Sequence, residues 1–236
     1  AGARILTGTP VRELRRTPDG WRITAGDEVL DADAVVLATP AGPAARLLDG
    51  LAPAAAAELR GVEYASMALV TMAFRRSDLP PAITSGDASG FLVPPVDGRT
   101  VKASTFSSNK WAWAREADPE LFLLRTSVGR HGDERDLARD DADLVQVSLA
   151  DLGDAVGLAA RPVASTVTRW DGGLPQYPVG HLARVARIRA AVAAVPGLAV
   201  CGALYDGVGI PACIASARAA ADEVAGALTG TPGTDH

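Results

Sequence analysis

The strongest fold signal in the chain is Leu204-Tyr205-Asp206-Gly207-Val208-Gly209-Ile210-Pro211-Ala212-Cys213-Ile214. The apolar residues 198–201 just before it predict a short buried strand. Gly207 and Gly209 permit backbone angles that are closed to other residues, and they let a ligand approach closely. Pro211 suits the first position of a helix. The stretch therefore predicts a strand, a tight glycine turn and a helix.

The predicted helix runs to Leu228, because apolar residues recur at helical spacing: Ile210, Ile214, Ala217, Ala221, Val224 and Leu228. The start of such a helix directs free N–H groups and the positive end of the helix dipole at one spot. That spot suits an anion or the electron-rich edge of a ring. Tight packing of a glycine turn explains the same residues without any ligand.

Composition limits the class of protein. The 236 residues are 48% hydrophobic, which is enough to bury one large core or two modest ones. The net charge of −5 argues against a nucleic-acid partner. Three scattered histidines and two cysteines predict neither a metal site nor a disulfide framework, which favours a cytoplasmic protein. No apolar run reaches the ~18 residues of a transmembrane segment.

Taken in order, the sequence predicts two regions with different secondary structure. The first sixty residues indicate strands at 11–15 and 21–24, a buried parallel strand at 33–38, and short helices at 43–48 and 53–60. The middle indicates antiparallel strands at 67–74, 90–94, 100–106 and 121–128, an amphipathic helix at 136–152 and a strand at 162–169.

Two motifs in the C-terminal part resemble one family. The string YDGVGIP-x-CI at 205–214 is similar to the C-terminal flavin segment of protoporphyrinogen and coproporphyrinogen III oxidases, FAD-dependent members of the flavin amine oxidase superfamily. Trp170 and LPQYPVGH at 174–181 resemble that family's (I/L)PQY-x-x-GH element. The string DAVVLATP at 33–40 resembles its D-x-V-V-x-A-x-P strand. Ala212 departs from the pattern, since the family often has Asp there.

The resemblance implies an α/β fold of mixed α+β character. Residues 1–60 and 170–228 would be parts of an FAD-binding Rossmann-like domain, 61–169 a mainly antiparallel substrate-binding sheet domain, and 229–236 a flexible tail. The family also holds FAD through an N-terminal βαβ unit with G-x-G-x-x-G, which this sequence lacks. We therefore expect the C-terminal half of a longer protein, inactive alone, with an incomplete FAD site. The alternative is a complete protein that descends from such a half.

The implied activity is FAD-dependent oxidation of a porphyrinogen, coproporphyrinogen III or protoporphyrinogen IX, with dioxygen as acceptor, in haem biosynthesis. The flavin carries the redox chemistry, so no catalytic side chain or metal is expected. Two alternatives stay open: another flavin amine oxidase-like enzyme, such as an amine oxidase or a carotenoid desaturase, and a non-catalytic interaction domain without cofactor. Homo-oligomerisation and peripheral attachment to a membrane also stay open.

The resemblance implies a set of cofactor-binding residues: the Val11 backbone at the adenine, Thr39 near the cofactor, Trp170 against the flavin, Gly207 in the turn, and the N–H groups of Val208, Gly209 and Ile210 at the flavin N1–C2=O edge. Lys110 and Arg125 are expected to meet substrate propionates, since ammonium and guanidinium groups suit carboxylates. A core tryptophan and solvated surface charges are the alternatives for Trp170 and for these two cations. Tyr177 and His181 could equally pin their loop and cap the following helix.

Overall fold

The computed structural model describes residues 2–229, which form a mixed α/β fold. The chain divides into two compact units. The first joins Ala1–Glu63 to Pro175–His236, and the second is Tyr64–Leu174. Of the predicted tail at 229–236, only Thr229 is described, and it ends a helix. The other tail residues lie outside the described part of the chain.

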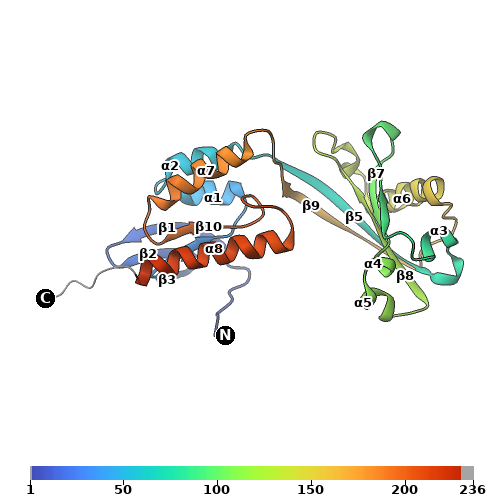
Figure 1. Cartoon of the computed structure of the whole chain (residues 1–236), viewed down its shortest axis with the longest axis horizontal. Coiled ribbons are helices and arrows are strands. Elements are labelled where there is room, and N and C mark those ends of the chain that lie inside the picture. The colour runs from blue at the N-terminus through green and yellow to red at the C-terminus, as the bar shows by residue number, and fades with distance from the viewer. Residues whose placement is uncertain (1, 230–236) are drawn as a thin grey trace. The chain divides into compact units, whose positions relative to one another are not determined.

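The first unit combines an antiparallel meander with a parallel strand pair. Its described elements are β1 (Val11–Thr17), β2 (Gly20–Ala25), β3 (Glu28–Ala32), β4 (Val35–Leu37), α1 (Ala41–Leu48), α2 (Pro53–Arg60), α7 (His181–Ala193), β10 (Leu198–Val200) and α8 (Ile210–Thr229). The meander has the order β1-β2-β3, and β10 runs parallel to β4 with Ala199 opposite Val36. Figure 1 shows α7 with α1 and α2 along one side of the β4–β10 pair and α8 along the other.

The two strands of the parallel pair differ in burial. All three residues of β10 are buried, as the sequence predicted. In β4 only Leu37 is buried, and Val36 is 37% exposed. The prediction of a fully buried strand at 33–38 was therefore wrong. An apolar run shows that a strand can be buried, but the elements that cover each of its faces depend on the tertiary structure.

Helix α8 forms where the sequence predicted it, but its buried face differs from the predicted stripe. The side chains that pack inward are Ser216 and Ala220, and Ala220 joins Ala199 and Cys201 in a small cluster. Ile210 and Ile214 are exposed instead. The small residues allow α8 to lie close to β10, so the packed face is the one with small side chains. Pro211 is the second helical residue, one position later than predicted.

The second unit is built on a five-stranded sheet in the order β6-β7-β8-β5-β9. Its elements are β5 (Tyr64–Arg75), α3 (Pro81–Thr84), β6 (Gly90–Leu92), β7 (Val101–Thr105), α4 (Ser107–Lys110), α5 (Ala112–Glu116), β8 (Leu121–Val128), α6 (Asp141–Val156) and β9 (Ala164–Pro175), with short 3-10 turns at Arg76–Asp78, Pro95–Asp97 and Arg135–Ala138. The pairings of β5 with β8, β8 with β7 and β7 with β6 are antiparallel, which confirms the prediction.

The core of this unit lies on one face of the sheet. Alternate residues of β5 and β8 point into it, among them Val70, Phe74 and Phe122, and helix α6 covers them with Leu144 and Leu152. The residues between them face the other side and are only half-buried. The sheet therefore has one packed face and one partly open face among the described residues.

The predicted helix at 136–152 is divided in two. Residues 135–138 form a 3-10 turn, and α6 begins only at Asp141, because the Asp140 side chain accepts a hydrogen bond from the Asp143 N–H at 2.8 Å. An aspartate in this position caps a helix and so sets its start. The helical spacing of the leucines continues across the 3-10 turn and α6, so the apolar pattern did not indicate that the helix is interrupted.

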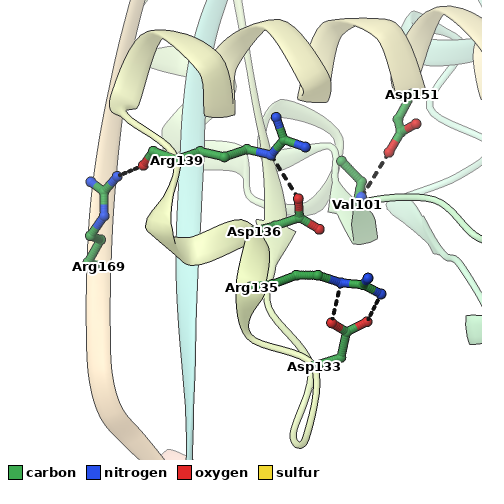
Figure 2. Close-up of polar contacts among 7 residues, drawn as sticks. All are labelled: Val101, Asp133, Arg135, Asp136, Arg139, Asp151 and Arg169. Atoms are coloured by element: carbon green, nitrogen blue, oxygen red, sulfur yellow. Dashed lines mark hydrogen bonds and ion pairs between the residues drawn. The ribbon is translucent and has the colours of Figure 1, made fainter.

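Polar contacts tie α6 and the 3-10 turn to the strands around them. Figure 2 shows Asp151 of α6 accepting from the Val101 N–H at 2.8 Å, beside the irregularity in β7. It also shows Arg169 of β9 donating to the Arg139 carbonyl at 2.8 Å, while Arg139 pairs with Asp136. These contacts link three separate stretches of the second unit.

No described helix is at once long and apolar enough to cross a membrane.

Candidate functional site

The carboxyl ends of the parallel strands β4 and β10 lie side by side in the first unit. The Cys201 N–H donates to the Leu37 carbonyl at 3.1 Å, which extends the strand pairing by one step. Beyond this point the segment after β4 continues through Thr39 into α1, and the segment after β10 continues through the glycine turn into α8. In open α/β sheets, ligands bind beyond the carboxyl ends of the strands. The fold therefore places two of the predicted cofactor segments at one edge.

Gly207 is the residue that makes the turn. Its φ is +134°, and a Cβ at this position would lie 3.0 Å from the Cβ of Ala212. Gly209 differs, because it is not among the glycines with positive φ, and a Cβ there would meet only the Pro211 ring at 3.8 Å. Of the two glycines, only Gly207 therefore uses the backbone angles that glycine permits.

The start of α8 presents N–H groups that the helix itself does not use. The first bond of the helix runs from the Cys213 N–H to the Gly209 carbonyl at 3.0 Å. The N–H groups before it have no acceptor within the helix, and Pro211 has no N–H. Gly209 and Ile210 are also exposed at this end. The arrangement offers several donors and the positive end of a helix dipole to an electron-rich group.

The Q-Y-x-x-G-H element holds the segment before the turn. The buried His181 ring lies with Nε2 2.9 Å from the Leu204 carbonyl, so this nitrogen donates the hydrogen bond. The Tyr177 hydroxyl donates to the Ala203 carbonyl, and its ring stacks on His181 with 3.9 Å between ring centroids. His181 opens α7 without capping it. The expectation was therefore right for the loop, which leads into the glycine turn, and wrong for the cap.

Asp206 anchors the turn from the other side. Its carboxylate accepts from Arg189 of α7 at 2.5 Å. The hydrogen bond from Arg189, followed by one from Ser216, lowers the pKa of Asp206 below its usual range, although burial opposes this. The contact with Arg189 therefore ties the turn to α7.

Thr39 and Val11 complete the predicted contacts in this unit. The Thr39 hydroxyl is buried and has no hydrogen-bond partner among the described residues. A buried hydroxyl without a partner is costly, so it is a natural site for a ligand contact. Val11 opens β1 and is partly exposed, and the pairing of β1 with β2 shifts just after it. Its backbone is thus at an irregular point of the meander.

Trp170, Lys110 and Arg125 belong to the second unit. Trp170 lies on β9, which leads into the loop at 176–180, and it is 52% exposed, so it is not a core tryptophan among the described residues. Lys110 ends α4, and Arg125 lies on the half-buried face of β8. Both cations lie over the Trp111 ring, with Lys110 Nζ 5.0 Å and Arg125 Cζ 5.7 Å from its centroid.

Comparison with known proteins places this geometry in a family. Residues 1–225 match the family of flavin-containing amine oxidoreductases. The chain belongs to this family. It is 41% identical over 197 residues to a coproporphyrinogen III oxidase of Mycobacterium tuberculosis, covering 84% of this chain and 41% of the relative. It is 33% identical over 222 residues to a coproporphyrinogen III oxidase of Bacillus subtilis, covering 93% of this chain and 46% of that protein.

A solved structure agrees with the family's fold. The crystal structure of a candidate protoporphyrinogen oxidase from Exiguobacterium sp. 255-15 superposes with a TM-score of 0.76 at 32% identity, over 89% of this chain and 45% of that one. The chain thus spans less than half the length of these relatives. The mixed α/β fold and the family resemblance drawn from the glycine turn and the PQY-x-x-GH element are confirmed.

Sequence reasoning missed several residues that shape the candidate sites. Asp206 and Arg189 hold the turn, and nothing in their spacing indicated the pair. Ser108 and Asn109 anchor the turn that carries Lys110: the Ser108 hydroxyl accepts from the Leu123 N–H at 2.9 Å, and the Asn109 amide donates to the Ile83 and Ala88 carbonyls. The polar run before Lys110-Trp111 is a signal that could have indicated such an anchor.

Proposed function

We propose that the protein to which this chain belongs oxidises a porphyrinogen to the porphyrin with FAD as cofactor and dioxygen as acceptor, in haem biosynthesis. One observation carries the proposal: the free N–H groups at the start of α8 meet the carboxyl ends of β4 and β10, behind a glycine turn pinned by Tyr177 and His181. Coproporphyrinogen III or protoporphyrinogen IX would be the substrate, since relatives are named for oxidation of each.

The residues present fit a flavin at this edge. The helix start offers donors to an electron-rich ring edge, and the buried Thr39 hydroxyl has no partner among the described residues. When bound, FAD would take up a hydride and pass the electrons to dioxygen. The N–H groups of Val208, Gly209 and Ile210 would donate to the N1–C2=O edge, and the dipole of α8 would stabilise negative charge there. Val11 would contact the adenine and Trp170 the flavin.

The other residues of the chain bind and orient, and none needs to act as a nucleophile; the proton lost with each hydride would pass to solvent. Conversion of a porphyrinogen to a porphyrin removes six hydrogens in three two-electron steps, each of which reduces one dioxygen to hydrogen peroxide. Lys110 and Arg125 would hold the substrate through its carboxylates. Gly207 has a role in geometry alone, since its φ allows the turn that exposes the helix start.

The test uses the full-length protein and this chain side by side. Each is mixed with excess FAD and desalted, and the absorption near ~450 nm reports retained flavin. Coproporphyrinogen III and protoporphyrinogen IX are then supplied in air, and porphyrin fluorescence and peroxide are followed. We expect flavin retention and porphyrin formation by the full-length protein. Retained flavin with oxidation of amines and not of porphyrinogens would overturn the substrate, and no retained flavin would overturn the cofactor.

A further inference from the structure

The turn before α8 carries a negative charge beside the N–H groups that the proposed flavin would use. Asp206 directly precedes Gly207, and those N–H groups belong to residues 208–210. An aspartate is ionised at neutral pH, and a negative charge near the start of a helix offsets the positive end of the helix dipole. An unpaired Asp206 would therefore oppose an electron-rich ring edge at this place.

Arg189 of α7 neutralises this carboxylate. Its Nη2 donates to the Asp206 Oδ2 at 2.5 Å, and this hydrogen bond is the largest of the causes that lower the pKa of Asp206. The guanidinium also lies over the ring of the buried Tyr205, with 5.8 Å between Cζ and the ring centroid. Arg189 thus contacts the two residues that precede Gly207, and both contacts hold its guanidinium beside the turn.

Arg189 is the arginine of α7 that reaches the glycine turn. The other two, Arg184 and Arg187, pair with Glu58 of α2 instead. The helix is anchored by its buried residues, which are His181, Val185, Ile188 and Val192. The side chain of Arg189 is 43% exposed, so it contributes a charge and not core packing to the first unit.

The ion pair borders an open cavity of about 350 Å³ that is bounded by α7, β10 and α8, and Glu223 lines it too. Among the described residues of the lining, Arg189 is the only cation, whereas Asp206 and Glu223 are both carboxylates. No other described cation of the lining would replace Arg189 if its charge were removed. The charge of Asp206 would then act on the helix start through partly solvated surroundings, at a strength that falls with added salt.

We propose that Arg189 is a positioning residue for the flavin: it neutralises Asp206, and the start of α8 thereby stays electropositive toward the cofactor. Arg189 acts through Asp206 and needs no contact with the flavin. The inference rests on the proposed function and adds to it the charge balance of the turn. It makes the midpoint potential of the bound flavin depend on an ion pair beside the turn as well as on the backbone donors.

Flavin affinity and midpoint potential in the full-length protein test the proposal. FAD is titrated into the apoprotein, and its fluorescence gives the dissociation constant; reductive titration with a reference dye gives the potential. We expect Arg189→Met to weaken FAD binding roughly threefold to tenfold and to lower the potential, because a free carboxylate disfavours added electrons. Arg189→Lys should keep most of both, because lysine keeps the charge. Added salt should reduce the effect of Arg189→Met.

A double variant separates the charge from the physical link between α7 and the turn. Arg189→Met, Asp206→Asn and the double variant all lack the ion pair, so a purely structural role predicts the same loss in each. The proposal predicts a lowered potential in Arg189→Met alone, and a potential close to that of the wild type in the double variant. Arg187→Met is the matched control, since it removes another exposed arginine of α7 that pairs with a carboxylate, and it should leave the potential unchanged. Urea denaturation shows whether each variant is folded.

Two outcomes would overturn the proposal and leave the proposed function standing. One is an equal loss of affinity and potential in the three variants that lack the ion pair, which would assign Arg189 a structural role. The other is an unchanged affinity and potential in Arg189→Met. A wild-type protein that retains no flavin would instead overturn the proposed cofactor and this inference together.

Discussion

Gly207 adopts a φ of +134°, and the side chain of any other residue would point at Ala212. We expect Gly207→Ala to lower the free energy of unfolding by about 1–3 kcal/mol, because alanine is strained at this φ. Gly226→Ala is the matched control: Gly226 lies exposed in α8 with nothing within 4 Å, and alanine should stabilise there by about 0.5–1 kcal/mol. Urea denaturation followed by circular dichroism measures both. Equal shifts would contradict the special role of Gly207.

Tyr177 contributes a ring and a hydroxyl, and the two can be separated. Tyr177→Phe keeps the stacking on His181 and removes the hydrogen bond to the Ala203 carbonyl. We expect a loss of about 0.5–1.5 kcal/mol and faster amide hydrogen exchange in residues 202–209, because the loop loses one of its anchors. Exchange that stays unchanged in this segment would show that His181 alone holds the loop.

At the scale of elements, α8 presents two faces with different chemistry. The inward face carries Ser216 and Ala220, and the Ser216 hydroxyl accepts from the Gly202 N–H at 3.3 Å. The outward face carries the larger apolar residues. The helix is therefore placed by small side chains and one polar contact, which a search for the most hydrophobic stripe does not find.

The two faces of α8 should respond differently to substitution. Ile214 is 49% exposed, so Ile214→Ser should change the free energy of unfolding by less than about 0.5 kcal/mol. Ala220 is buried against Ala199 and Cys201, and Ala220→Leu should cost about 1–3 kcal/mol through overpacking. Thermal denaturation of the two variants measures the difference. A larger loss for Ile214→Ser would mean that the outward stripe is covered in solution.

At the scale of the whole molecule, the first unit holds three carboxylates whose pKa values lie below their usual range. Hydrogen bonds from arginine are the main cause for each: Arg22 at Asp31, Arg187 at Glu58 and Arg189 at Asp206. A carboxylate with a lowered folded pKa stabilises the fold at pH values above its unfolded pKa. This contribution disappears as the pH falls through the folded pKa.

This charge pattern predicts how the first unit responds to acid. Stability from these pairs should be fully present above the ordinary values of 3.8 for aspartate and 4.5 for glutamate, and it should decline below them. Glu58→Gln should make the urea midpoint less dependent on pH between 6 and 3. Asp19→Asn, at a residue without an ion pair among the described residues, is the control. The effect is small, because the pairs are exposed. An identical pH dependence in both variants would contradict the assignment.

The glycine turn and the helix that follows it could be predicted from the sequence because their signals are local. Gly207 and the apolar spacing after it report on backbone geometry within one turn, and the strand at 198–201 precedes them directly. Thr39 is different, since only the parallel pairing of β4 with β10 brings it to the same edge. The anchoring of the turn by His181 and Asp206 required contacts across 23 and 17 residues, which no pattern encodes.

The sequence by itself determined the order and type of most elements, the antiparallel character of the middle sheet and the family. These depend on periodicity, turn residues and short motifs, which are properties of neighbours along the chain. The tertiary structure alone decided which face of α8 is buried and which side chains surround Lys110 and Arg125. Those outcomes depend on packing between distant segments, where close approach outweighs average hydrophobicity.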